Sequence, residues 1–394
     1  MTDHQPGLPP ATAAWREGDP AAWRRFLATG PLRTELGGGL PDVVVAYETW
    51  GSLNDDADNV VLVHHALTGD AHVTGTAAPG QPTPGWWDGI VGPGRAIDTD
   101  RWFVICANVL GGCQGTTGPA SPAGDGRPYG SRFPRITIRD QVAVESRLLM
   151  ALGIREVAAV LGGSMGGMRA LEWLVEQPLP VRSGVLLATG ARATADQIAT
   201  QTAQIACITA DPQWRGGNYH DAPAGRGPHV GMGLARRFAH LTYRSESDLD
   251  LRFGVHVQPG EEPLGPVAAG VSPEAGRFAI QSYLDHHADK LARRFDAGTY
   301  VALTDAMNTH DVGRGRGGIA AALSRVAAPV TIAGITSDRL YPLRQQEELA
   351  RLISTASDLV IIDSAVGHDA FLTEIETVSQ VISESLGLLA PTTT

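Results

Sequence analysis

Short apolar runs that alternate with helical patterns constrain the fold more than any other feature of this sequence. Each run is four or five residues long and ends near a glycine or a polar residue. Such short runs with β-branched residues favour strands that are buried on both faces, as in a mainly parallel sheet. The runs are Val43–Ala46, Val60–Val63, Phe103–Ala107, Val157–Leu161, Val185–Ala188, Val330–Ala333 and Leu359–Ile362.

Stretches with helical periodicity lie between these runs. Ile138–Leu152 places apolar residues on one face, Met168–Leu174 follows a glycine-rich turn, and Phe371–Leu386 closes the chain. Strands that alternate with helices predict an α/β fold with crossover connections. We therefore expect a mainly parallel central sheet with helices on both faces.

The stretch from about residue 193 to 309 interrupts this alternation. It lacks a clear buried strand and carries helical segments among polar, glycine-rich loops, which fits a helical lid over the sheet. The helical segments are Ala195–Ala206, Leu234–Thr242 and Gly276–Arg294. We therefore expect a helical lid domain of residues 193–309, a core domain of residues 41–192 and 310–394, and an N-terminal arm of residues 1–40.

The charge and hydropathy of the chain exclude several functions. Its 394 residues include 31 Lys and Arg against 42 Asp and Glu, a net charge of −11, which disfavours binding to nucleic acid or to an anionic membrane surface. No apolar run reaches the ~18 residues that a transmembrane helix needs. The N-terminus also lacks the basic and apolar segments of a secretory signal. We expect small-molecule substrates as partners, with no nucleic acid and no membrane.

The cysteine and lysine residues exclude further chemistry. Cys106, Cys113 and Cys207 form neither an even disulfide set nor a CxxC pattern, which favours a reducing cytoplasm and predicts no metal site. Lys290 is the single lysine, and no Gly-Lys-Ser/Thr sequence exists. The chain therefore lacks a P-loop and a good Schiff-base lysine, so we expect no bound cofactor.

The segment Gly162-Gly163-Ser164-Met165-Gly166 is a GxSxG pentapeptide. It follows the strand-like EVAAVL and precedes the helix-like MRALEWLVE, which is the strand–turn–helix context of a nucleophile elbow. The glycines permit the unusual backbone angles and the close approach that the turn requires. The context favours Ser164 as a nucleophile over a plain glycine-rich turn.

Two polar residues after later strand-like runs complete a predicted triad. A serine nucleophile needs a histidine base that a carboxylate orients, in the chain order Ser, Asp or Glu, His. Asp338 follows VTIAGITS, and His368 follows DLVIIDSAVG. Taken separately, Asp338 could serve only as a helix N-cap, and His368 could be a surface residue. Asp363 is the rival carboxylate, although it lies on the same segment as His368 and is less well placed to reach the ring.

An acyl-transfer intermediate also needs two backbone N–H donors for its oxyanion. Met165, the residue after the nucleophile, should supply one of them. The loop HHALTGDAH, which follows an earlier strand, should supply the other from Ala66 or Leu67, and we predict the pair Leu67 and Met165. A simple turn at the strand end is the alternative interpretation of this loop.

Four segments together give a more specific signal. They are HHALTGDAH (64–72), NVLGGCQGTTGPAS (108–121), LGGSMGGMRALEW (161–173) and AVGHDAFL (365–372). In this order they resemble the homoserine O-acetyltransferase family, and the resemblance spans roughly residues 40–385. It implies an α/β-hydrolase fold with a helical cap.

The resemblance implies a ping-pong reaction of methionine biosynthesis. Ser164 takes an acetyl group from acetyl-CoA, with His368 as the general base and Asp338 holding His368. L-homoserine then accepts the group on its hydroxyl and leaves as O-acetyl-L-homoserine. Acetyl-CoA is a co-substrate, and a cap with a narrow tunnel would exclude the water that competes for the acyl-enzyme. The family also implies a homodimer that is built from cap helices.

The zwitterionic acceptor calls for a guanidinium and a carboxylate in the site. The family's arginine lies in a Gly-Leu-x-x-Ala-Arg-type cap segment, and GMGLARRFAHLTYRS matches it best at Arg236, with Arg237 adjacent. Tyr243 on the same segment could add a hydrogen bond. The family's carboxylate follows the catalytic histidine, which indicates Asp369. A surface ion pair for Arg236 and a helix N-cap for Asp369 are the structural alternatives.

Four other functions stay open at this point. Succinyl-CoA could replace acetyl-CoA, which would make the chain a homoserine O-succinyltransferase. The acceptor could be L-serine or an antibiotic alcohol. Water could be the acceptor, as in a simple serine esterase, although an esterase has no need of a zwitterion site. A non-catalytic binding protein of the same fold is disfavoured because Ser164, Asp338 and His368 are all present.

Overall fold

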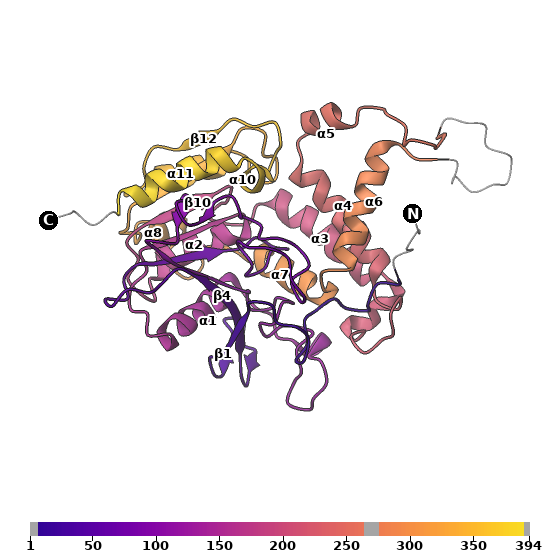
Figure 1. Cartoon of the computed structure of the whole chain (residues 1–394), viewed down its shortest axis with the longest axis horizontal. Helices are drawn as coiled ribbons and strands as arrows, with labels where there is room; N and C mark the ends of the chain where they lie inside the picture. Colours follow the sequence, from indigo (N-terminus) through magenta and orange to yellow (C-terminus); the bar gives the residue numbers. More distant parts are fainter. Residues whose placement is uncertain (1–6, 264–275, 390–394) are drawn as a thin grey trace.

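An eight-stranded sheet forms the centre of the molecule (Figure 1). The computed structural model describes residues 7–263 and 276–389, so parts of the predicted arm (1–6), lid (264–275) and core (390–394) lie outside the described residues. The strand order is β1 (Arg25–Ala28), β4 (Val44–Trp50), β8 (Phe103–Ala107), β5 (Val60–His64), β9 (Ala159–Gly163), β10 (Gly184–Leu187), β11 (Val330–Ile335) and β12 (Val360–Ile362). β4 is antiparallel to β1 and β8, and the other neighbours are parallel. The predicted mainly parallel sheet is confirmed.

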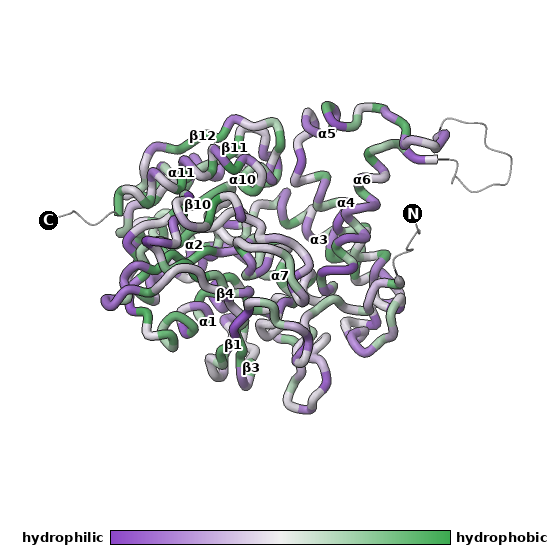
Figure 2. Tube along the Cα trace, in the orientation of Figure 1, coloured by the Kyte–Doolittle hydropathy of each residue, from purple (hydrophilic) through white to green (hydrophobic). Residues whose placement is uncertain are grey.

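Alternate residues of the central strands pack into two separate hydrophobic cores, one on each face of the sheet. Val60 and Leu62 of β5 pack in the core that contains α1 and α2, whereas Val61 and Val63 pack in the core that contains α11. This alternation follows from the two-residue period of a strand. Helices therefore cover both faces of the sheet, and Figure 2 shows hydrophobic residues along β10 and β11 between them.

The helices of the core divide between these two faces. On one face are α1 (Ile138–Ala151), α2 (Met165–Glu176), α8 (Ile319–Leu323) and α9 (Arg344–Leu352). On the other are α10 (Ala370–Thr373) and α11 (Ile375–Gly387). The strand pairs β2 (Leu32–Arg33) with β3 (Gly39–Leu40) and β6 (Val91–Gly92) with β7 (Ile97–Asp98), and the 3-10 turn Gly130–Arg132, lie outside the main sheet. No helix in the described part of the chain is long and apolar enough to cross a membrane.

The predicted lid region is helical, and its helices gather on one side of the sheet (Figure 1). It contains α3 (Ala195–Thr209), the 3-10 segment Pro212–Gly217, α4 (His229–Tyr243), α5 (Glu246–Arg252), α6 (Ala279–Ala292) and α7 (Ala297–Asn308). α4 packs against both α3 and α6. The sequence analysis missed α7, which is buried along much of its length and therefore lacks a clear polar face. The division into arm, core and lid stays a prediction.

The range predicted as an arm contains paired strands, unlike a loose lead-in, since β2 pairs with β3 and β1 joins the main sheet. Residues Arg25–Ala28 form β1, which pairs with β4 so that Phe26 lies opposite Ala46. The Phe26 ring also stacks on Trp15, with ring centroids 4.6 Å apart. A four-residue edge strand carries too short a pattern to stand out in the sequence.

Candidate active site

Ser164 lies at a sharp turn between β9 and α2. Its backbone angles are φ 56° and ψ −125°, a conformation that residues other than glycine rarely adopt. Two glycines near the turn cannot carry a side chain. A Cβ on Gly162 would lie 2.6 Å from the backbone of Gly166, and a Cβ on Gly166 would lie 2.2 Å from the carbonyl oxygen of His64. The geometry is that of a nucleophile elbow.

Asp338 and His368 form a buried pair at the carboxyl ends of β11 and β12. His368 Nδ1 lies 2.7 Å from Asp338 Oδ2. The other oxygen, Oδ1, accepts the backbone N–H groups of Leu340 and Tyr341, each at 2.8 Å, so both oxygens are held in place. Burial opposes a charge on His368, but the attraction and hydrogen bond of Asp338 outweigh it and raise the pKa of His368.

The second ring nitrogen of His368 is free to accept a proton. Nε2 is buried and has no hydrogen-bond partner among the described residues, including Ser164 Oγ. In ligand-free enzymes the bond between nucleophile and base is often formed only when substrate binds. The rings of Tyr341 and Phe371 enclose His368, with centroids at 5.1 Å and 5.4 Å. Sequence reasoning missed Tyr341, whose position three residues after Asp338 was the available signal.

The rival carboxylate Asp363 lies elsewhere. It is exposed at the end of β12 and accepts a hydrogen bond from Thr336 Oγ1 at 3.0 Å. Asp338, by contrast, is buried and contacts the His368 ring. The geometry therefore favours Asp338 as the carboxylate that orients His368.

The loop after β5 is fixed at two successive peptide groups. Arg169 Nη2 donates to the carbonyl oxygen of His65 at 2.7 Å, so the trans peptide directs the Ala66 N–H the opposite way. The carbonyl of Ala66 accepts from Gly69 N at 2.9 Å and lies 2.8 Å from His65 Nδ1, which directs the Leu67 N–H away in turn. In the described part of the chain, the N–H groups of Leu67 and Met165 make no hydrogen bond.

The ring of His65 is held in one tautomer. Its Nε2 accepts the N–H of Val109 at 3.1 Å, so the ring proton is on Nδ1 and is donated to the Ala66 carbonyl. Burial, with the nearby Arg169 cation, lowers the pKa of His65 to about 3. A neutral histidine therefore connects the two motifs HHALTGDAH and NVLGGCQGTTGPAS.

A buried ionic cluster lies beneath this loop, and sequence reasoning missed it. Glu145 of α1 binds Arg169 at 2.6 Å, His64 at 3.0 Å and the Trp173 indole N–H at 3.0 Å. Burial opposes the charge of Glu145, but Arg169 and His64 lower its pKa to about 2. In the sequence Arg169, five residues after Ser164, resembles an ordinary charge on a helix surface, and only the fold shows that it is fully buried.

Arg236 and Arg237 point in different directions from α4. Arg237 pairs with Asp285 at 2.7 Å, and both side chains are about one-third exposed. Arg236 has its Nε and Nη1 atoms buried without a hydrogen-bond partner among the described residues. Its guanidinium carbon lies 5.5 Å from the centre of the Tyr243 ring, which in turn lies 6.0 Å from the His368 ring. Arg236 is therefore the arginine on the site side of the helix.

Asp369 lies beside this group, directly after His368. Burial raises the pKa of Asp369, although His368, Arg236 and Arg244 act in the opposite direction. Arg244 Nη1 lies 3.9 Å from Asp369 Oδ2. Asp369 takes the N-cap position of α10, but its side chain makes no capping hydrogen bond. His368, Tyr243, Arg236 and Asp369 thus gather where α4 meets the segment between β12 and α10.

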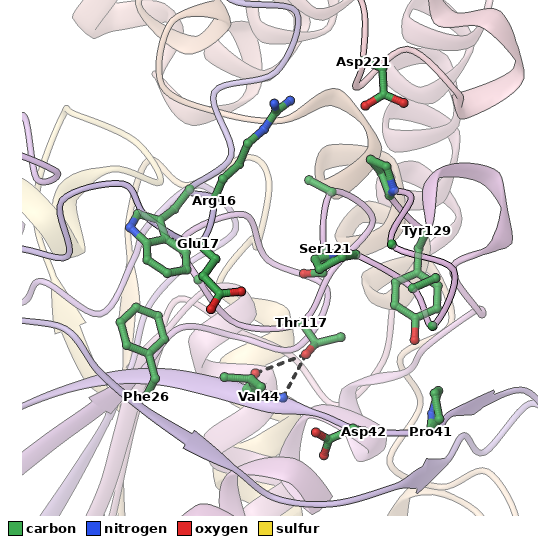
Figure 3. Close-up of a pocket in the computed structure, with 18 residues that line it drawn as sticks. Arg16, Glu17, Phe26, Pro41, Asp42, Val44, Thr117, Ser121, Tyr129 and Asp221 are labelled. Carbon is green, nitrogen blue, oxygen red and sulfur yellow. Dashed lines mark hydrogen bonds between the residues drawn. The ribbon is translucent and has the colours of Figure 1, made fainter.

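Two pockets lie differently relative to the predicted site residues, and only one of them includes such a residue. A pocket of about 800 Å³ is lined by Trp15, Glu17, Phe26, Asp42 and Tyr129, with Thr117 bonded to Val44 at its base (Figure 3). None of the predicted site residues lines it. A smaller pocket of about 300 Å³ is lined by Ala66 of the predicted oxyanion loop and by Arg236, but not by Ser164 or His368. The smaller pocket therefore adjoins the predicted site. Among the described residues, no group of His, Cys, Asp and Glu has the arrangement of a metal site.

Comparisons with known proteins identify the family to which the chain belongs. The alpha/beta hydrolase fold family matches residues 59–375. Homoserine O-acetyltransferase of Thermobifida fusca (strain YX) is 60% identical over 385 residues, which cover 98% of this chain and 99% of the relative. A crystal structure of homoserine O-acetyltransferase from Bacillus anthracis has a TM-score of 0.82 at 27% identity, covering 92% of this chain and 97% of the other. Esterase E22 also has a TM-score of 0.82, at 28% identity and with coverage of 92% and 99%. The chain therefore belongs to the homoserine O-acetyltransferase family within the α/β-hydrolase fold.

Proposed function

We propose that the chain transfers an acetyl group from acetyl-CoA to the hydroxyl of L-homoserine through an acetyl-Ser164 intermediate. His368 Nε2 takes the Ser164 proton as Oγ attacks the thioester carbonyl, and the N–H groups of Leu67 and Met165 stabilise the oxyanion. The C–S bond then breaks, and CoA leaves as the thiol after His368 returns the proton. The buried Asp338–His368 pair at 2.7 Å supports this step.

In the second half-reaction the homoserine hydroxyl is the nucleophile, and Ser164 Oγ is the leaving group. His368 takes the proton of the homoserine hydroxyl, whose oxygen attacks the acetyl-serine carbonyl. The bond to Ser164 Oγ breaks, Oγ recovers a proton from His368, and O-acetyl-L-homoserine leaves. Such a product would enter methionine biosynthesis. The only co-substrate required is acetyl-CoA, and no step needs a metal or a bound cofactor.

The observation that carries this proposal is the unpaired guanidinium of Arg236. A buried charge is costly unless a partner of opposite sign completes it, and within the described residues Arg236 has no ion pair. The carboxylate of homoserine would supply that partner, and the Asp369 carboxylate would receive the substrate ammonium. Tyr243, whose ring lies below the guanidinium, would add a hydrogen bond to the acceptor.

Hydrolysis is the second candidate function. Esterase E22 shares the fold at 28% identity. An esterase needs the same nucleophile, base and oxyanion donors, with water as the acceptor. A zwitterion site at Arg236 and Asp369 has no use in that reaction, so it favours transfer over hydrolysis.

We propose a cytoplasmic homodimer in which the lid helices meet. Val230, Leu234, Phe238 and Leu241 recur at helical spacing on α4 and are exposed by 73%, 43%, 45% and 39%. A contiguous apolar stripe of this kind is typical of a protein interface. Sedimentation of a Phe238→Glu variant as a monomer, beside a dimeric parent, would support this interface.

The release of free CoA tests the function directly. A thiol reagent would follow release from acetyl-CoA, with and without L-homoserine, and from succinyl-CoA in parallel. Release that requires both acetyl-CoA and homoserine supports the proposal. Release with succinyl-CoA alone would change the donor, and fast release without homoserine would indicate an esterase. A Ser164→Ala variant should abolish release, whereas acetyl trapped on another residue would contradict the nucleophile assignment.

A further inference from the structure

A positively charged pocket lies between the loop after β5 and the end of α6. This is the pocket of about 300 Å³, and the loop contributes Ala66, Thr68, Gly69 and Asp70 to its lining. From α6 and the turn after it come His287, Lys290, Leu291 and Arg294. Spacings of three, four and seven residues place these four side chains on one helical face. Since Ala66 belongs to the predicted oxyanion loop, the pocket adjoins the place where an acyl group must arrive.

Lys290 is the exposed cation of this pocket. It is the only lysine of the chain, and within residues 7–263 and 276–389 it makes no ion pair. The acidic residues near it on α6 have other partners. Asp285 lies 2.7 Å from Arg237, and Asp289 lies 2.8 Å from Arg293. The Lys290 ammonium is therefore available to a ligand.

Arg294 attaches the end of α6 to the loop. Its Nη2 donates to the Thr68 carbonyl at 2.7 Å, and its Nη1 lies 3.8 Å from Asp70 Oδ2. Asp70 is the one carboxylate in the lining, against the three cations Lys290, Arg294 and Arg236. The ring of His287 adds no charge near neutral pH, because burial, together with Arg236 and other neighbouring cations, lowers its pKa to about 4. The pocket therefore has an excess of positive charge.

This local excess contrasts with the −11 net charge of the whole chain. An acidic protein repels a polyanion unless a site of opposite sign receives it. Arginine and lysine are the usual partners of phosphate oxygens. Homoserine offers one carboxylate, whereas a coenzyme A thioester carries several phosphate charges at the end remote from its acyl group. The half-buried Trp86, whose indole N–H donates to the Asp70 carbonyl at 2.9 Å, adds an aromatic wall for the apolar part of such a donor.

We propose that this pocket binds a phosphate group of the acyl donor, with Lys290 and Arg294 as the phosphate contacts. The inference rests on the proposed function, because it assigns the donor side of the same site. The donor phosphate would bind beside the same loop that carries the Leu67 N–H.

The test compares two acetyl donors in matched variants. Acetyl-CoA carries the phosphates, and S-acetyl-N-acetylcysteamine is a thioester without them. Lys290→Glu reverses the charge in the pocket. Arg293→Glu makes the same charge change on the adjoining turn, where the guanidinium pairs with Asp289 instead. Lys290→Arg keeps the charge and serves as the rescue.

Lys290→Glu should raise the KM for acetyl-CoA on the order of tenfold or more, which is the loss of one charge-assisted contact. The KM for the phosphate-free thioester and for homoserine should stay within twofold of the parent, as should all constants of Arg293→Glu and Lys290→Arg. An unchanged KM for acetyl-CoA in Lys290→Glu would overturn the inference. So would an equal rise for both donors, or an equal effect of Arg293→Glu.

Direct binding separates this inference from the proposed function. If the parent protein transfers acetyl from neither donor, the proposed function fails on its own. Calorimetric titration with coenzyme A then decides the pocket. Binding to the parent that weakens at least tenfold in Lys290→Glu would support the phosphate site, and equal or absent binding would overturn it.

Discussion

Arg169 Nη2 donates to the carbonyl oxygen of His65 at 2.7 Å and so joins the elbow helix to the loop that carries the predicted oxyanion donor Leu67. The other terminal nitrogen, Nη1, binds Glu145 at 2.6 Å, which holds the guanidinium in a fixed orientation. The nucleophile and the predicted oxyanion donor are thus positioned against each other by one buried side chain. Arg169 is a positioning residue, since it contacts neither substrate nor reacting atom.

Arg169→Lys should lower kcat by about 100-fold, the effect of misplacing one oxyanion donor. The lysine keeps a cation beside Glu145 but cannot bind both Glu145 and the His65 carbonyl. The KM for homoserine should stay unchanged, because the proposed acceptor contacts are Arg236 and Asp369. Single-turnover acetylation of Ser164 measures the effect, with the melting temperature as the check on folding. A stable variant with full acetylation rate would refute the positioning role.

Asp338→Asn should lower kcat/KM by about 10⁴-fold, because an amide cannot stabilise the protonated ring or fix its tautomer. Asp363→Asn is the matched control, since it changes a carboxylate near the same strand end that bonds only Thr336 in the described structure. Its activity should stay within twofold of the parent. Steady-state assays of the two variants decide between them, and the reverse ranking would transfer the role to Asp363.

The sequence predicted the elements that carry a strong local pattern. Each apolar run became a strand, and Ser164, Asp338 and His368 follow β9, β11 and β12 as expected. What it could not predict depends on contacts between distant segments. Arg169 and Glu145 lie in amphipathic helices, where each resembles an ordinary surface charge until the fold buries both. The family motif had favoured Arg236 over Arg237, and the packing of α4 adds the physical reason, since Arg237 pairs with Asp285 instead.

The rate of acylation should depend on pH through His368. The ring must be neutral to accept the Ser164 proton, and Asp338 raises the pKa of His368 above its usual value of 6.5 against the effect of burial. Activity should therefore fall with unit slope as the pH decreases through an apparent pKa above 6.5. In Asp338→Asn the attraction disappears and burial remains, so this limb should move to lower pH. A pH profile of kcat/KM for acetyl-CoA measures both, and a limb below 6.5 in the parent would contradict this assignment.

Arg236→Ala should raise the KM for homoserine by about 100-fold, because the substrate carboxylate would lose a buried, charge-assisted contact. Arg237→Ala is the matched control on the adjacent position, and it should leave that KM unchanged because Arg237 pairs with Asp285 at 2.7 Å on a partly exposed face. An altered acceptor also tests Asp369, the carboxylate that is proposed to bind the substrate ammonium. Homoserine methyl ester lacks the carboxylate, so the parent and Arg236→Ala should use it equally poorly, whereas Asp369→Asn should still impair its use. An Arg236→Ala variant with the parent's KM for homoserine would place the carboxylate contact on another side chain, and Arg244, 3.9 Å from Asp369, would be the next to substitute.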